Sequence, residues 1–253
     1  MDSVLECYSR LCDVLGPSIE SVDVIKRAEE HRWYWRPSQV KIVLLAESHV
    51  YTTDDELARE IRLPPSAPSN LPRGFVRLVY CLGYGENSLL DRPISSPRNN
   101  GTPQFWKIFY SCINNATTNT DFIPIHVSAT LTTERIANKL SLLHQLREQG
   151  VWLLDTCLAA LYLPGSPKPS HSTRETCLQV GWDYHIGNVL QAANPQQVIC
   201  IGKGVFHALE DRLGKIRIPV KVLPQPQARL SSAEHFQSFG TYYHFVQEVN
   251  KSM

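Results

Sequence analysis

The sequence predicts an α/β fold, a three-layer α/β/α sandwich around a central, mainly parallel four-stranded sheet. Two observations lead to this prediction. The composition, with 43% hydrophobic and 19% charged residues, is that of a chain able to bury a sizeable core. Short apolar runs also alternate with segments of helical periodicity, which is the order of strands and crossover helices in a parallel sheet.

Four continuous apolar runs are predicted to be buried strands: residues 40–46, 151–154, 197–201 and 220–223. Strands of a parallel sheet are hydrophobic throughout because helices cover the sheet from both sides. We therefore expect the four runs to lie side by side in one sheet.

Helices are predicted between and after these runs. Residues 133–149 place Leu140, Leu143 and Leu146 on roughly one face, and Gly150 follows as a stop signal. Similar patterns cover residues 174–193, 204–213 and 231–250.

Two turn-rich segments, residues 63–73 and 92–103, follow the first strand and are predicted to be functional loops. Neither resembles a linker, because no second independent core follows. Residues 1–253 are therefore predicted to form a single domain, with an N-terminal helical extension at about residues 1–36.

The net charge of +1 neither indicates nor excludes a nucleic-acid-binding protein, since a local basic patch suffices for binding. No apolar run approaches the ~20 residues that cross a bilayer. The N-terminus lacks the charged-then-apolar layout of a signal peptide. We expect an intracellular protein, cytoplasmic or nuclear, that does not enter a membrane.

The seven cysteines include no Cys-x-x-Cys pair, and several, such as Cys157 and Cys200, lie inside apolar runs. They are predicted to be buried thiols rather than ligands of zinc or of an iron–sulfur cluster. The histidines are scattered and form no metal-binding pattern. We expect no metal and no organic cofactor.

Polar side chains follow each predicted strand at its carboxyl end, where open α/β sheets bind their ligands. These residues are Glu47, Ser48, His49, Asp155, Lys203, Gln225, Gln227 and Arg229. Such a cluster is costly to assemble without a ligand that satisfies its polar groups. We expect it to form the functional site.

From about residue 40 to 249, the order of these segments resembles that of the uracil-DNA glycosylase superfamily. AESHVY stands where that family has a turn such as GQDPYH, GINPG or GEAPG, and QGVWLLDT is similar to its QGVLLLN strand. TPQFWKIFYSCI is similar to the helix with the NRFW signature, and its Phe105 and Trp106 are predicted to be core residues. Gly181-Trp182 is similar to a GW pair that opens a helix, and LPQPQ to the LPNPS or HPS loop.

The resemblance implies a role for each matching position. Ser48 stands at the position of the water-activating Asp or Asn, and Val50 at that of the tyrosine that excludes thymine. Asp155 replaces the base-reading asparagine, and Gln225 replaces the histidine that hydrogen-bonds the uracil carbonyl. Tyr80 is placed as the aromatic residue that stacks on the base.

Glu47 is the acidic position that the motif retains, as in the GEAPG branches. It can orient water or offset the positive charge that develops on the sugar, and its alternative role is to cap a helix or hold the turn. His49 can donate a proton to the leaving base or contact phosphate, and its alternative role is structural. Ser48 is not a useful general base and is expected in a turn or a cap.

An ionised aspartate only accepts hydrogen bonds, whereas an asparagine also donates them. Asp155 therefore favours a base with an exocyclic amine, such as cytosine, adenine or guanine, over uracil. The alternative is an ion pair of Asp155 with Lys203 or His171.

Gln225 can donate to a base carbonyl, although it stabilises a developing anion less well than a charged group does. Lys203, Gln227 and Arg229 are predicted to contact DNA phosphates. The alternative for Arg229 is a solvated surface charge.

The sequence thus predicts a DNA glycosylase-like monomer that binds DNA and excises a deaminated, damaged or mismatched base by hydrolysing its N-glycosidic bond. One alternative is a catalytically silent member of the fold that binds nucleic acid or a nucleotide. A second is a hydrolase that does not act on DNA and uses Glu47, His49 and Asp155.

Overall fold

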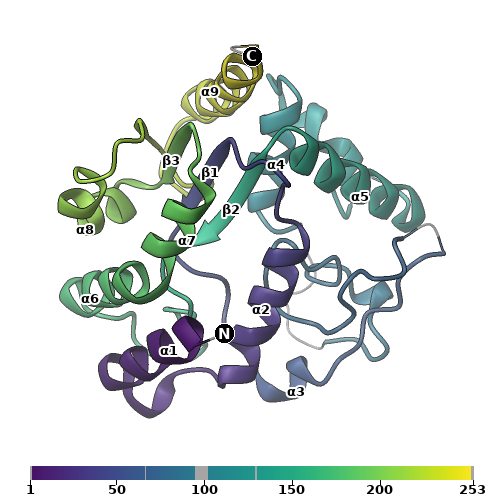
Figure 1. Cartoon of the computed structure of the whole chain (residues 1–253). Helices are drawn as coiled ribbons and strands as arrows, with labels where there is room; N and C mark the ends of the chain where they lie inside the picture. Colours follow the sequence, from purple (N-terminus) through teal and green to yellow (C-terminus); the bar gives the residue numbers. More distant parts are fainter. Residues whose placement is uncertain (1, 66, 95–101, 129, 252–253) are drawn as a thin grey trace.

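Four parallel strands form the central sheet of the protein, in a computed structural model that describes residues 2–65, 67–94, 102–128 and 130–251 (Figure 1). The strands are β1 (Ile42–Ala46), β2 (Val151–Asp155), β3 (Gln197–Ile201) and β4 (Val220–Leu223). Their order in the sheet is β2-β1-β3-β4, so β1 and β3 are central. The register pairs Ala46 with Asp155, which sets the ends of β1 and β2 side by side.

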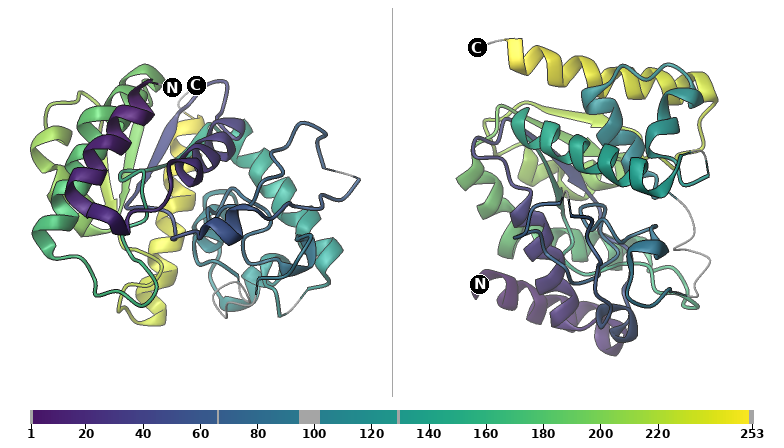
Figure 2. Two further views of the ribbon diagram at one scale, coloured as in Figure 1. Left: turned by 90° about the horizontal axis from the view of Figure 1, so that it is seen from below. Right: turned by 90° about the vertical axis from the view of Figure 1, so that its right-hand side faces the viewer.

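Helices cover both faces of the sheet, and the predicted three-layer α/β/α architecture is confirmed (Figures 1 and 2). One layer holds α4 (Phe105–Ile113), α5 (Thr132–Glu148) and α9 (Ser232–Lys251), with α4 in contact with the other two. The other layer holds α1 (Asp2–Leu15), α6 (His171–Gly181), α7 (Gly187–Ala193) and α8 (Lys203–Leu213). Within it, α1 and α8 both contact α6.

Further elements connect these helices and strands. They are α2 (Val22–Tyr34), α3 (Asp54–Leu57) and the short 3-10 turns η1 (Gly16–Ser18), η2 (Asn87–Leu89) and η4 (Asn119–Ile125). Residues 1–36 were expected to be a helical extension, and α1 and α2 account for the helices. Both pack into the fold, α1 on α6 and α2 through the edge-to-face contact of Trp33 with Trp152 of β2.

The helix predicted at 174–193 is longer and less regular than expected. It begins at His171, where the hydroxyl of Ser170 accepts a hydrogen bond from the backbone N–H of Thr173. It then runs without a break through a π turn, η5 (Trp182–Ile186), into α7. Gly181 and Trp182 lie inside this run, at the junction of α6 and the π turn.

The prediction that β4 is a buried strand is also wrong. Its residues are half-buried or exposed, and Val222 is 36% exposed. It lies at one edge of the sheet, where only β3 pairs with it. The strand at the other edge, β2, is buried throughout because α5 and Trp33 of α2 pack against it. Lys221 of β4 lies over the ring of Phe245 in α9.

The cysteines behave as the apolar runs predict. All seven are free thiols, and six of them are buried. Burial raises the pKa of the Cys200 thiol to about 12, which suppresses the reactive thiolate.

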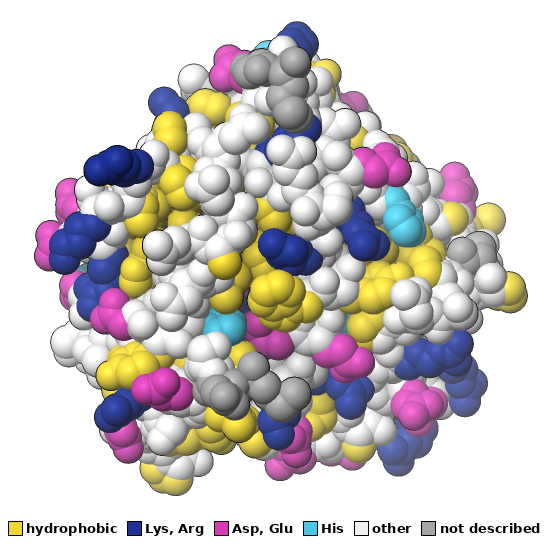
Figure 3. All heavy atoms as spheres, viewed as in Figure 1, with side chains coloured by type: hydrophobic (Ala, Val, Ile, Leu, Met, Phe, Trp, Pro, Cys, Tyr) yellow, Lys and Arg dark blue, Asp and Glu magenta, His cyan; other side chains and the backbone are white. Residues whose placement is uncertain are grey.

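Across the part of the chain that the structure describes, no helix has both the length and the apolar character needed to span a bilayer. On the face shown in Figure 3, lysine and arginine side chains alternate with aspartate and glutamate side chains. The described residues of 63–73 form neither helix nor strand, as expected. Within the second predicted loop, residues 95–101 lie outside the described residues.

Candidate functional site

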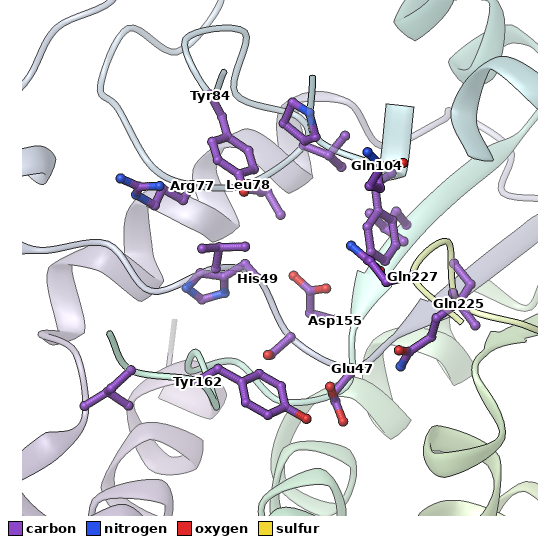
Figure 4. Close-up of a pocket in the computed structure, with 18 of the residues that line it drawn as sticks. Glu47, His49, Arg77, Leu78, Tyr84, Gln104, Asp155, Tyr162, Gln225 and Gln227 are labelled. Atoms are coloured by element: carbon purple, nitrogen blue, oxygen red, sulfur yellow. The ribbon is translucent and has the colours of Figure 1, made fainter. Parts of the chain in front are cut away.

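A pocket of about 670 Å³ opens at the carboxyl ends of the strands (Figure 4). Residues 47–50 after β1, Asp155 at the end of β2, and Gln225 and Gln227 after β4 line it, together with residues 77–79, 103–105, 162, 163 and 165–168. We call it the strand-end pocket. Glu47, Asp155 and Gln225 all line it, so the predicted convergence of these three side chains is confirmed.

Glu47 directly follows β1 and is held in place through both its backbone and its side chain. Its carbonyl accepts a hydrogen bond of 2.8 Å from the backbone N–H of Cys157. Its carboxylate accepts a hydrogen bond from Nε of Arg174 in α6. The charge of this carboxylate also acts on Tyr162, whose pKa is raised, first by burial and then by the charge of Glu47. Glu47 is thus an ion-paired carboxylate on the pocket wall.

Asp155, the last residue of β2, has an ion pair that the sequence did not predict. Its Oδ2 accepts a 2.6 Å hydrogen bond from Nη2 of Arg32 in α2, and Nη1 of Arg32 binds Glu29. The alternatives of Lys203 and His171 as partners are wrong: Lys203 is exposed, and His171 lies against Glu175. Among the described residues, none donates to Oδ1 of Asp155, so this atom can accept a hydrogen bond from a ligand.

His49 is buried in the pocket wall and faces another carboxylate. Its Nε2 lies 2.5 Å from Oε1 of Glu20, a residue in the connection between α1 and α2. Burial lowers the pKa of His49, but the adjacent Glu20 charge and hydrogen bond outweigh this effect and raise the pKa above its usual value. The charge of Glu20 therefore favours the protonated form of His49.

Ser48 and Val50 have different surroundings, although both line the pocket. The Ser48 hydroxyl accepts a 3.4 Å hydrogen bond from the backbone N–H of Leu161, which is the turn role expected for it. Val50 is 38% exposed at the mouth, and its N–H donates to the carbonyl of Arg77. Val50 is thus open to a ligand of the pocket, while Ser48 joins two loops.

The placement of Tyr80 as the base-stacking residue is wrong. Tyr80 is 2% exposed, and its hydroxyl accepts a 2.8 Å hydrogen bond from the backbone N–H of Leu153. It packs against Phe109 in the core, and burial raises its pKa. The aromatic residues that line the pocket are Tyr84, Phe105 and Tyr162.

Phe105 and Trp106, the two residues of α4 that were predicted to lie in the core, differ in their burial. Trp106 is completely buried, as predicted, whereas Phe105 is half-buried and lines the pocket. Neighbouring helix positions point in different directions, and the sequence did not indicate which one faces the cavity.

Gln225 and Gln227 line the pocket from the loop after β4. Gln225 packs directly on Gly202, where a Cβ atom would lie 2.8 Å from its Nε2. Gly202 also has φ +101°, which side-chain-bearing residues rarely adopt, so this close approach requires glycine. Lys203 and Arg229 are exposed and do not line the pocket, and their contact with phosphate stays a prediction.

Sequence reasoning missed five residues that hold or line the site. Arg32 and Arg174 pair with its carboxylates, Glu20 pairs with His49, and Tyr162 and Lys168 line the pocket. Tyr162 and Lys168 lie in the loop that follows β2. Because open α/β sheets bind ligands at the carboxyl ends of their strands, a search of the whole loop rather than of its first residues would have found them. Nothing local in the sequence marks the other three.

Apart from the exposed Lys168, the charged side chains on the pocket wall are paired with a side chain of opposite charge. Glu47 is paired with Arg174, Asp155 with Arg32 and His49 with Glu20, and Arg77 binds Glu56 through two hydrogen bonds. Within the described residues, no group of three or more His, Cys, Asp or Glu side chains is arranged to hold a metal ion. A wall of this kind suits a neutral, polar, flat ligand with hydrogen-bonding edges rather than a multiply charged one.

Compared with known proteins, the chain matches no family model and no curated sequence.

Proposed function

We propose that this protein is a DNA glycosylase-like enzyme that binds DNA and hydrolyses the N-glycosidic bond of a deaminated, damaged or mismatched base. The observation that carries the proposal is the convergence of Glu47, Asp155 and Gln225 on one pocket lined by three aromatic side chains. DNA is the proposed partner, and the protein is proposed to act as an intracellular monomer.

The size and lining of the pocket support a nucleobase as ligand. Its volume of about 670 Å³ lies within the range of ~300–1,000 Å³ for small-molecule sites. Tyr84, Phe105 and Tyr162 offer faces on which a flat heterocycle can stack. A base in duplex DNA reaches such a pocket by leaving the stack.

The carboxylate of Glu47 supports hydrolysis at the sugar. Cleavage of the glycosidic bond develops positive charge on the sugar, and a fixed anion next to it lowers the free energy of the transition state. Arg174 fixes the orientation of Glu47 before the substrate arrives. Gln225 supplies amide donors on another side of the pocket.

The alternative of a catalytically silent binding protein is favoured by one specific observation. Both pocket carboxylates are already ion-paired with arginines, and Ser48 occupies the position of the usual acid or amide. A hydrolase that does not act on DNA and uses Glu47, His49 and Asp155 is less well supported. Glu20 binds Nε2 of His49, and Arg32 and Arg174 hold the two carboxylates, so none of the three is a free base.

The test is single-turnover formation of abasic sites on oligonucleotides carrying uracil, hypoxanthine, xanthine or a mismatch. Glu47→Gln keeps the shape and an acceptor for Arg174 but removes the charge. We expect its rate to fall at least ~10²–10⁴-fold, with little change in affinity at a stated salt concentration.

Glu175→Gln is the matched control, because Glu175 lies on the same helix as Arg174 and pairs with the exposed His171. It should retain the wild-type rate. A wild-type protein that binds DNA but releases no base in the panel indicates the catalytically silent binding protein. If Glu47→Gln cleaves at the wild-type rate, Glu47 has no role in the mechanism.

A further inference from the structure

A second cavity, of about 600 Å³, lies at the opposite end of the sheet from the strand-end pocket. Residues of η5 and α7 form one side, and the last turn of α8 and the connection to β4 form the other. Two of its lining residues, Asn194 and Ile218, shortly precede the amino ends of β3 and β4, so we call it the strand-start cavity. Among the described residues, none lines both cavities, and a ligand here is therefore independent of the proposed glycosylase function.

Positive charges exceed negative charges in the wall of the strand-start cavity. Arg212, Lys215 and Arg217 line it, and Asp183 is the one acidic side chain that the described part of the wall contains. Arg212 donates to both carboxylate oxygens of Asp183, from Nε at 2.8 Å and from Nη2 at 2.6 Å, so this pair is neutral. The side chains of Lys215 and Arg217 have no ion-pair or hydrogen-bond partner within the part of the chain that the structure describes. Two uncompensated positive charges favour an anionic ligand.

Trp182 adds a hydrogen-bond donor to this wall. The residue is 7% exposed, and its indole N–H has no partner among the described residues. The indole nitrogens of Trp35 and Trp106 are also without a partner but fully enclosed, whereas that of Trp182 is not. The N–H of Gly187 donates to the carbonyl of Trp182 in the π turn, and a Cβ atom on Gly187 would lie 3.0 Å from the indole nitrogen. Because Gly187 has no side chain, the indole N–H stays open to a ligand that accepts a hydrogen bond.

The rest of the wall suits the organic part of a small molecule. Asn188 and Gln191 offer amide groups, and Ile216 and Ile218 offer apolar surface. The volume of about 600 Å³ lies within the range of ~300–1,000 Å³ for small-molecule sites. Two free cations and an unpartnered donor beside apolar surface match a ligand that joins an anionic group to an organic body.

We propose that the strand-start cavity binds a small phosphate monoester, whose phosphate group is held by Lys215, Arg217 and the indole N–H of Trp182. A phosphate monoester carries a charge of about −1.5 to −2 at pH 7 and presents three acceptor oxygens. This charge balances the two cations, and the oxygens accept from all three donors. A backbone phosphate of DNA carries one negative charge and balances the two cations less well.

Nuclear magnetic resonance of ¹⁵N-tryptophan-labelled protein tests the site directly, with adenosine 5′-monophosphate as the probe. The chain has five tryptophans, and Trp182→Phe identifies the indole resonance that belongs to Trp182. We expect millimolar adenosine 5′-monophosphate to shift this resonance and adenosine to leave it unchanged. If the nucleotide does not shift the resonance, or if adenosine shifts it equally, the proposal is overturned.

Calorimetric titration at constant ionic strength measures the contribution of each group to the affinity for adenosine 5′-monophosphate. The double variant Lys215→Ala/Arg217→Ala should bind at least ~10-fold more weakly, because it loses two charge-assisted hydrogen bonds. Both side chains are exposed, so their removal leaves the core intact. Trp182→Phe keeps an aromatic ring but removes the donor, and it should bind about 3–10-fold more weakly.

The matched control is Lys26→Ala, which removes an exposed cation of α2 that pairs with Asp23. It should bind the nucleotide as the wild type does. If the double variant binds as tightly as the wild type, the nucleotide occupies another site and the proposal is overturned. Formation of abasic sites tests the glycosylase separately, so either proposal can fail without the other.

Discussion

The two carboxylate oxygens of Asp155 lie in different surroundings, and this difference determines what a base can present to them. Oδ2 is engaged by Arg32, and Arg32 is also neutralised by Glu29. Among the described residues none donates to Oδ1, and a carboxylate oxygen can only accept a hydrogen bond. The side chain, which is 3% exposed, therefore combines a buried ion pair with one oxygen that is not engaged by the described residues.

The variant Asp155→Asn tests whether Asp155 recognises the base as a hydrogen-bond acceptor. Its amide oxygen can still accept from Arg32, while its NH2 group replaces the acceptor in the pocket. We expect the wild type to prefer a base that presents an N–H group, and the variant to shift toward a carbonyl-bearing base such as uracil. The ratio of the two single-turnover rates should change at least ~100-fold.

Thermal unfolding controls for damage to the ion pair, since Glu29 still neutralises Arg32 in the variant. Efficient uracil release by the wild type, with the same ratio in Asp155→Asn, contradicts the acceptor role.

The continuous helical run of α6, η5 and α7 packs against the segments that carry Glu47 and Asp155. Arg174 lies in α6, and Gly181 at the end of α6 packs against the carbonyl of Thr156, the residue after Asp155. A Cβ atom on Gly181 would lie 1.9 Å from that oxygen. The helix approaches the strand end this closely only because position 181 has no side chain.

Gly181→Ala is therefore expected to destabilise the protein, while Gly240→Ala in α9 is the matched control. At Gly240 the nearest atom to a new Cβ is Oδ1 of Asn115, at 3.9 Å. We expect Gly181→Ala to lower the free energy of unfolding by about 1–3 kcal/mol and Gly240→Ala to raise it by about 0.5–1 kcal/mol. Urea unfolding of both variants checks the opposite signs. Equal effects mean that the backbone contact at Gly181 is easily relieved.

Several buried histidines connect the stability of the whole molecule to pH. Burial lowers the pKa of His31 to about 4 and that of His185 to about 4. In the unfolded chain both bind protons near pH 6.5, so the unfolded state holds more protons between pH 6.5 and about 4. Stability from these two groups is present above pH 6.5 and is lost as pH falls toward 4.

We expect the free energy of unfolding to fall by a few kcal/mol over this range in the wild type. His185→Gln should flatten the dependence, and His207→Gln should not, because the side chain of His207 is 65% exposed. Urea unfolding at stepped pH measures the slope. If the free energy of unfolding of the wild type does not change with pH over this range, the two histidines are not buried in their neutral form.

DNA binding, in the proposed function, is a property of the surface around the pocket rather than of the net charge. The net charge is +1, and cations and anions alternate on the face shown in Figure 3. Lys168 lines the pocket, and the exposed Arg229 lies in the loop after β4. Few phosphates are therefore expected to be contacted.

Salt dependence of DNA binding tests these contacts. Removing one phosphate contact should reduce the magnitude of the slope of log affinity against log salt by about 1. We expect this for Lys168→Ala and for Arg229→Ala. Lys215→Ala should leave the slope unchanged, since Lys215 lines a different cavity, formed with Trp182 and Ile216. An unchanged slope in all three variants places the DNA elsewhere.

The strands and the place of the site followed from the sequence. The apolar run before Glu47 and the run that ends at Asp155 are local patterns, and parallel strands end at the same edge of a sheet. Glu47, Asp155 and Gln225 therefore had to meet once the four runs paired. The partial exposure of β4 could not be predicted from the sequence, because central strands and edge strands can have the same apolar pattern.

The ion-pair partners of the pocket carboxylates could be identified only from the tertiary structure. Arg32 reaches Asp155 across 123 positions of sequence, and Arg174 reaches Glu47 across 127. The burial of Tyr80 and the exposure of Phe105 to the pocket likewise depend on which side each backbone turns toward the core. Hydrophobic periodicity is a property of neighbouring residues, whereas ion pairs and cavity walls join residues that only packing brings together. The sequence by itself therefore determined where the site lies, and the packing determined which of its atoms remain free to meet a ligand.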